Sequence, residues 1–338
     1  MLGEKWTAKP RSGALAALLL AAVALAGVAT TMLTAGGASA QVKPESCGKA
    51  SPETLALTVG GVAAQIYSGE VSSSETIKDR LQVESYAPLL QAVASGEEAA
   101  VRTAVTSLVY SHTHIVRLRV TRRGKLLADV GGPYILAPLS GSLRLHGRTI
   151  GHYVLSVQDD VGYVKIEHRF IGDPLVLRTS AQNVPIEGLM EPGPAVVPDH
   201  GAVHYEHAIF QAYSFKASSF PGGSLRISIL VPLPGGLSRE SCTLIKNNEL
   251  RTVTRRVAGQ LALGPVNFQV YVDLVKTLTN GRFYIRAGSR QLAGTTGQAP
   301  RRLPDSGSVR EGGVSYEVSS FLAPSSVGPV RVYELFPE

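Results

Sequence analysis

The chain has 338 residues, of which 44% are hydrophobic and 17% charged; this balance excludes disorder over most of its length and suffices for two or three modest domains. The formal charge of +7 does not indicate nucleic-acid binding, because lysines and arginines are scattered singly and never form a run of five. A solvated, mildly basic surface is the better interpretation, and no nucleic-acid partner is expected.

The first forty residues differ in composition from the rest. Three basic residues precede an uncharged apolar run over 14–37, and Ala38 and Ala40 then form an A-x-A cleavage pattern. The pattern predicts a secretory signal peptide over 1–40, cleaved after Ala40, with an uncleaved N-terminal membrane anchor as the alternative. We therefore expect the protein to be secreted or to lie in the cell envelope, outside the cytoplasm.

Two cysteines follow the predicted leader, Cys47 and Cys242, and each ends an identical "ESC" segment. An even number of cysteines in an oxidising compartment favours one disulfide. The alternative is two unpaired thiols.

Helical sequence follows each cysteine. Ser51-Pro52-Glu53 has the residue types of a helix start, namely an N-cap, a first-turn proline and an acid near the positive end of the dipole. The apolar positions that follow have helical spacing, at Leu55, Val59, Val62 and Ile66, and the equivalent positions after the second cysteine are Leu250, Thr254, Val257 and Leu261. A second helix is expected in each case, around 95–108 and 268–275.

A threefold internal repeat organises the remaining sequence. Each copy contains a strand-like segment ending in arginine, then a proline with a glycine three residues later, then a serine before an apolar residue; these are Arg119, Pro138, Gly141 and Ser156, then Arg178, Pro198, Gly201 and Ser214, then Arg286, Pro304, Gly307 and Ser320. Each copy is expected to close with a strand, at 164–166, 225–227 and 330–332. Such regular recurrence indicates three copies of one β-rich unit.

The first copy carries an aspartate pair before its expected closing strand. Asp159-Asp160 could be interpreted as paired catalytic carboxylates, but the matching segments of the other copies are turn-like. We therefore expect the aspartates to start a hairpin turn.

The layout of helix, strand pair around "HIVRLRVTRRGKLLADVGGP", loop and long hairpin "TIGHYVLSVQDDVGYVKIEHRF" resembles the Cache family of PAS-like extracytoplasmic sensor domains of bacteria. The resemblance is best over about 47–172 and looser over 240–338. It implies an α+β fold with PAS/Cache-like antiparallel sheet units repeated three times, and long helices before the first and third. It also implies small ligands, often carboxylates, amino acids or amines, on the open face of a sheet.

The expected division of the chain follows from the repeat and this resemblance. After the leader, 41–172 forms a first Cache-like module of helices and sheet. Residues 173–236 form a second sheet unit without its own long helices, and 237–338 form a third module with helices and sheet.

Side-chain alternation in the first copy predicts a candidate binding face. Arg119 on one strand and His152, Ser156 and Gln158 on another would share the polar side of the sheet and hold a small carboxylate. An ordinary solvated sheet face is the alternative, because Arg119 and Ser156 recur in every copy.

No enzyme or metal centre is indicated. The sequence contains no nucleophile elbow, phosphate loop, dinucleotide fingerprint or zincin helix, so we expect no catalytic residue and no cofactor. The histidines at 112, 114, 200, 204 and 207 are not accompanied by ligands placed to complete a metal site.

Two functions of different classes remain. The first is binding of a small polar or carboxylate solute outside the cytoplasm, as a sensory or accessory component with a membrane or envelope protein partner. The second is a secreted structural or protein-interaction module with no small ligand. An enclosed polar pocket would favour the first, and an exposed apolar patch or free sheet edge the second.

Overall fold

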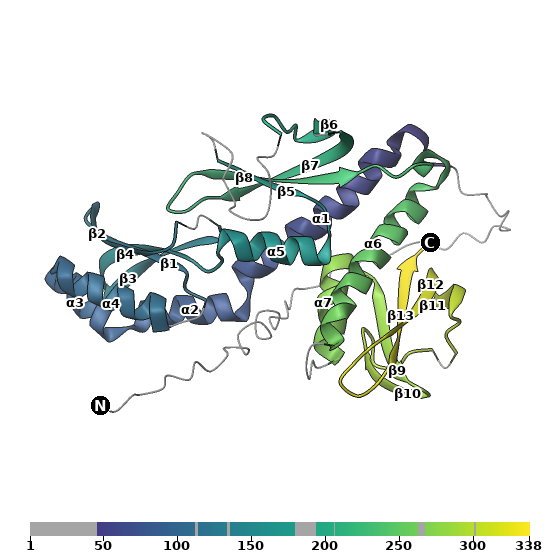
Figure 1. Cartoon of the computed structure of the whole chain (residues 1–338). Coiled ribbons are helices and arrows are strands. Elements are labelled where there is room, and N and C mark those ends of the chain that lie inside the picture. The colour runs from purple at the N-terminus through teal and green to yellow at the C-terminus, as the bar shows by residue number, and fades with distance from the viewer. Residues whose placement is uncertain are drawn as a thin grey trace, which may run out of the picture.

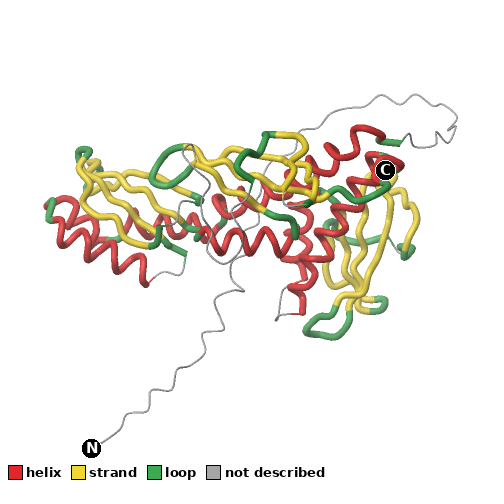
Figure 2. The backbone as a smooth tube through the Cα atoms, turned by 45° about the horizontal axis from the view of Figure 1, so that its top comes forward, coloured by secondary structure: helices red, strands yellow, loops and turns green. Residues whose placement is uncertain are grey.

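The computed structural model describes residues 46–111, 114–133, 136–179, 194–205, 207–262, 268–300 and 302–338. The expected signal peptide over 1–40 lies outside these ranges, as does His112. Three sheets lie along a layer of helices, as Figures 1 and 2 show from two directions. Among the described helices, none combines the length and apolar character needed to cross a membrane.

The helices are α1 Ser51–Ser72, α2 Ser74–Ser85, α3 Ala87–Ser95, α4 Glu98–Ser111, α5 Asp160–Phe170, α6 Cys242–Ala258 and α7 Phe268–Thr279, with short 3-10 turns at Gly48–Ala50, Leu237–Arg239 and Gly259–Ala262. The strands are β1 Arg117–Arg122, β2 Lys125–Gly131, β3 Pro138–Leu145, β4 Arg148–Ser156, β5 Leu175–Thr179, β6 His200–Tyr205, β7 Ala208–Ser218, β8 Ser224–Pro232, β9 Arg282–Ala287, β10 Arg290–Gly294, β11 Ser306–Glu311, β12 Val314–Ala323 and β13 Val330–Pro337.

The strands form three antiparallel sheets. Sheet 1 has the order β2-β1-β4-β3, sheet 2 the order β5-β8-β7-β6 and sheet 3 the order β10-β9-β13-β12-β11. The expected α+β class is therefore confirmed, with three antiparallel sheets and long helices before the first and third in sequence.

The repeat corresponds to one equivalent hairpin in each sheet: β3–β4, β6–β7 and β11–β12. The repeated glycine lies directly across the hairpin in every copy, pairing Gly141 with Tyr153, Gly201 with Ala212 and Gly307 with Val318. The repeated arginine lies on the first strand of each sheet, and the repeated serine on the second strand of each hairpin. The proline–glycine pattern therefore marks a shared backbone register.

The predicted closing strand is present in the second and third copies, but the prediction is wrong for the first copy. Residues 225–227 belong to β8 and 330–332 to β13, but 164–166 lie in helix α5. Asp159 is its N-cap, because its carboxylate accepts a hydrogen bond from the backbone N–H of Gly162 at 2.6 Å. The expected hairpin turn at Asp159-Asp160 is thus a helix start. Sheet 1 consequently lacks the strand that β13 supplies in sheet 3, and β4 pairs directly with β1.

The assignment of α1 also differs from expectation. The α1 stripe of Leu55, Val59, Val62 and Ile66 is buried as predicted, but it shares a core with sheet 2, α6 and α7. Helices α2, α3 and α4 instead cover sheet 1 and form a separate core with it. The sheet unit within 173–236 has no long helix of its own but is covered by α1, which packs on its strands β7 and β8.

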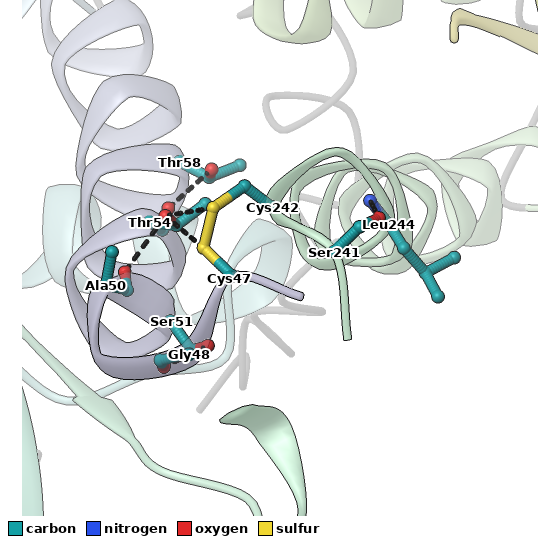
Figure 3. Close-up of a disulfide and its surroundings, with 9 residues drawn as sticks. All are labelled: Cys47, Gly48, Ala50, Ser51, Thr54, Thr58, Ser241, Cys242 and Leu244. Carbon is teal, nitrogen blue, oxygen red and sulfur yellow. Dashed lines mark hydrogen bonds between the residues drawn. A yellow bond between two sulfur atoms is a disulfide. The ribbon is translucent and has the colours of Figure 1, made fainter. Parts of the chain in front are cut away.

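A disulfide joins the beginning of α1 to the beginning of α6. Cys47 and Cys242 have their Cα atoms 4.8 Å apart and lie 195 residues apart in sequence. The backbone N–H of Cys47 also donates to Glu240 O at 2.7 Å, and Thr54 Oγ1 lies 3.3 Å from Cys47 Sγ (Figure 3). The two longest helices are thus held side by side at one end by a covalent bond and by backbone pairing.

Removing this bond by the double substitution Cys47→Ser and Cys242→Ser should lower the free energy of unfolding by up to about 5 kcal/mol, because the bond closes a very long loop in the unfolded chain. Urea unfolding of both proteins measures the difference. Equal unfolding midpoints would contradict a stabilising role.

Gly60 marks a close approach between α1 and sheet 2. A Cβ at this position would overlap the ring of Tyr213 on β7, whereas a Cβ at Gly61 would meet no atom within 4 Å. Gly60→Ala should therefore destabilise the protein by about 1–3 kcal/mol through overpacking. Gly61→Ala, the matched control, should stabilise it by up to about 1 kcal/mol, because alanine favours a helix interior. Thermal unfolding of both variants tests the pair; the same sign of change in both would refute the packing argument.

Candidate functional site

The outer face of sheet 1 carries Arg119 and His152, as the alternation of side chains predicts. Arg119 lies opposite Val154 of β4 and Asp129 of β2, while His152 lies opposite Thr121 and Ser142. The opposite face, with Leu118, Val120, Tyr153 and Leu155, is buried against the helices.

The charges on this face largely satisfy one another. Arg117 makes two hydrogen bonds to the Asp129 carboxylate, at 2.9 and 3.0 Å, and Arg119 Nη1 lies 4.0 Å from the same group. His152 is exposed, with Nδ1 3.3 Å from Ser142 Oγ. Phe220, from the β7–β8 connection, packs on the Arg117 guanidinium with its ring centre 4.3 Å away. This face is therefore a partly neutralised polar surface, with an aromatic ring from sheet 2 beside it.

Ser156 and Gln158 do not join Arg119 and His152 in a pocket. Ser156 is fully buried, and its hydroxyl donates to Leu136 O at 2.5 Å. Gln158 lies beyond the end of β4, is 5% exposed and donates to Asp159 O at 3.3 Å. Both side chains donate to backbone carbonyls where β4 passes into α5.

An open pocket of about 800 Å³ lies in sheet 3, beside the β9–β10 hairpin. It is lined by Gln269 of α7, Arg286 of β9, Ser289, Gln291 of β10 and parts of the segment 292–299. Arg286 is the repeat counterpart of Arg119, and it is the only charged residue among the described lining residues. The pocket therefore presents one cation among neutral amides and hydroxyls.

Hydrogen bonds fix the shape of this pocket. Gln291 donates to Gly297 O at 3.2 Å and accepts from the N–H of Ala299 at 2.8 Å, which holds the segment after β10 against the strand. Arg286 donates from Nη2 to Pro300 O at 2.8 Å, and its guanidinium lies 5.6 Å from the Tyr333 ring centre. Its Nε is buried without a hydrogen-bond partner among the described residues. Buried N–H groups are normally hydrogen-bonded, so an acceptor placed beside this Nε would be stabilising.

A second cluster of titratable groups lies between α1 and α5. Tyr163 donates to Glu167 Oε1 at 2.6 Å, and the Tyr67 and Tyr163 rings meet edge to face at 5.7 Å. Burial raises the pKa of Glu70 to about 7. Burial also raises the pKa of Glu167 well above its usual range, opposed by the Tyr163 hydrogen bond and reinforced by the Glu70 charge. Below pH 7 these carboxyls are thus held largely as neutral acids.

Several other titratable side chains make structural contacts. Among the residues that the structure describes, no three His, Cys, Asp or Glu side chains are grouped as metal ligands. His200 packs its ring on Tyr213 across the β6–β7 pair, with the ring centres 5.1 Å apart. Asp159 and Asp160 bond to backbone N–H groups, Asp159 to Gly162 and Asp160 to Leu136.

The sequence reasoning missed both of these features. The pocket of sheet 3 depends on Gln269 and Gln291, which carry no recognisable pattern, although the repeat had already paired Arg286 with Arg119. The acidic cluster was hidden because 164–166 was interpreted as a strand. The signal available for it was the N-cap Asp159 followed by an acid at Asp160 and basic residues at the end of the segment.

Comparison with known proteins finds similarity only among solved structures. No family model and no curated protein sequence matches the chain. The similar structures include an extracellular domain and a periplasmic domain. One is a domain of a sensory box/GGDEF family protein from Vibrio parahaemolyticus, with 10% identity over 54% of this chain and 97% of that chain and a TM-score of 0.33. Another is the periplasmic domain of Vibrio cholerae LuxQ, with 10% identity over 85% of this chain and 98% of that chain and a TM-score of 0.17.

A third is the extracellular domain of the histidine kinase vpHK1S-Z8, with 10% identity over 54% of this chain and 92% of that chain and a TM-score of 0.33. All three TM-scores lie below 0.5, so the functional argument rests on the chain's own residues.

The role of Ser156 can be tested directly. Ser156→Ala should lower the free energy of unfolding by about 1–2 kcal/mol, because it leaves the buried carbonyl of Leu136 without its donor. His152→Ala, on the same face but exposed, should change it by less than about 0.5 kcal/mol. Chemical denaturation measures both. A Ser156→Ala protein as stable as the unsubstituted one would contradict the structural role.

Proposed function

We propose that the protein is an exported, non-enzymatic Cache-like module that binds a small polar or carboxylate solute outside the cytoplasm. The observation that carries the proposal is the sheet 3 pocket, where the partly buried Arg286 is the one cation among the neutral groups of the described lining. A sensory or accessory role beside a membrane or envelope protein partner accords with the predicted leader.

The chemistry of the lining favours a monoanion. A guanidinium forms charge-assisted, fork-like hydrogen bonds with a carboxylate, and the surrounding glutamines and hydroxyls would bond the rest of a small polar ligand. None of the described lining residues is acidic, so no side-chain carboxylate of the lining competes with a ligand for Arg286. Its volume of about 800 Å³ is in the range of small-molecule sites.

The face of sheet 1 is a second location for the same function. Arg119 is about one-third exposed there and His152 is exposed, beside the Phe220 ring. Asp129 competes for Arg119, which makes this face the weaker candidate.

A protein-interaction role is the second candidate function, and one observation favours it. Ile77 and Leu81 lie one turn apart on α2 and are 55% and 56% exposed. Adjacent exposed aliphatic side chains on one helix face are typical of contact surfaces, although this pair is small.

Binding can be tested with pairs of small carboxylates and their uncharged primary amides in a thermal-shift assay. A carboxylate at a hundred times its Kd should stabilise the protein by about 2.7 kcal/mol, whereas the amide should not. Arg286→Gln should weaken the binding about 10- to 100-fold, the expected loss of a charge-assisted hydrogen bond, measured by titration calorimetry. Arg119→Gln, the matched control, should leave the affinity unchanged.

The two variants also separate the alternatives. Loss of binding in Arg119→Gln alone would move the site to sheet 1. A protein that responds to no carboxylate would overturn solute binding in the form proposed and favour the interaction role.

A further inference from the structure

The segment that carries α2–α4 and sheet 1 joins the rest of the protein at two neighbouring places. The chain enters it from the end of α1, at Ser72–Ser74, and leaves it from β4 into α5, at Ser156–Asp160. Helix α5 then packs on α6 and leads into β5 of sheet 2. In Figure 1, α5 crosses in front of α1 and lies between sheet 1 and α6. The position of the segment 74–156 therefore depends in part on how α5 docks, beside the Thr76 hydrogen bond to Glu70 O and the Phe220 ring on Arg117.

The contact between α1 and α5 is built from acids and phenols. Glu167 is 1% exposed, and its Oε2 has no hydrogen-bond partner among the described residues, while Oε1 accepts from Tyr163. Glu70 of α1 is 9% exposed and lies close enough to act electrostatically on Glu167 and on Tyr163. Tyr67 completes the contact through its ring. No basic side chain acts on Glu70 or Glu167 among the described groups.

Other charges face α5 from its C-terminal end. Asp173 lies on the connection to β5, and Glu249 and Arg256 lie on α6. Burial raises the pKa of Asp173 to about 7, with Glu249 reinforcing the shift and Arg256 opposing it. Arg256 therefore partly balances this end, whereas the α1 side is uncompensated.

We propose that the contact between α1 and α5 is a proton-dependent joint. Neutral Glu70 and Glu167 hold α5 in place, and ionisation of the pair loosens α5 and frees the segment 74–156 to move relative to sheets 2 and 3. Two carboxylates without a cation in one buried contact repel each other and lose hydration, so the docked arrangement tolerates them only while protonated.

The direction of the pH effect follows from linkage. An unfolded glutamate titrates near 4.5, whereas Glu70 in the folded protein titrates near 7. Between these values the folded state binds more protons than the unfolded state, so stability is greatest at low pH and falls as pH rises through this window. For one such group, the equilibrium for opening should rise about tenfold between pH 6 and pH 8.

Hydrogen–deuterium exchange of the full chain, corrected for intrinsic exchange rates, tests the joint. Protection of the α5 amides should fall about tenfold or more between pH 6 and pH 8, while sheet 3 amides change little. The double variant Glu70→Gln and Glu167→Gln keeps both shapes and the acceptor for Tyr163 but can ionise at neither position, so its α5 protection should stay nearly constant. Glu53→Gln, an exposed position at the start of α1, is the matched control and should follow the unsubstituted protein.

Further variants keep the test decisive. If the double variant does not fold, Glu70→Gln and Glu167→Gln should each reduce the step by eliminating one of the two acids. Asp173→Asn should leave the step in place, because its acid lies outside the contact between α1 and α5. Parallel pH profiles in the unsubstituted protein and in both glutamate variants would overturn the proposal, as would a step that disappears only in Asp173→Asn.

Discussion

The structure depends on the burial of one helix on two sides at once. Helix α1 packs on β7 and β8 of sheet 2 and also on α6, while Cys47, just before α1, is bonded covalently to the first residue of α6. The absence of a side chain at Gly60 lets the helix approach Tyr213 closely. Sheet 2 and the third unit therefore share a single core, to which α1 contributes a buried face.

The segment 74–156 forms a structural unit of its own. It has a core of its own beneath sheet 1 and is inserted between α1 and the strands that α1 covers. In sheet 1 the position of a closing strand is lost, because the corresponding sequence forms α5. The same helix then becomes the connection to sheet 2, so one local change in the repeat altered both the sheet and the linkage between units.

Polar groups follow the same division. Where the repeat is retained, its arginine lies on the first strand of the sheet, yet the surroundings differ. Arg119 is close to Asp129, whereas Arg286 faces neutral amides and keeps an unused donor. The buried carboxyls of Glu70 and Glu167, which have no basic partner among the described groups, lie where α5 contacts α1. The other copies have a strand in place of α5. The features with functional potential thus lie where the copies diverge.

The sequence by itself determined the elements whose signal is local. The stripe on α1, the hairpin register marked by proline and glycine, and the α+β class all follow from spacing along the chain, because backbone geometry and side-chain period act over a few residues. Only the tertiary structure decided which sheet α1 covers, because an apolar stripe shows that a face is buried and not what buries it. It likewise decided that Ser156 is hidden and that 160–170 is helical. Both outcomes depend on how β4 turns away from its sheet, and the local alternation of valine, lysine and isoleucine fits a strand or a helix equally well.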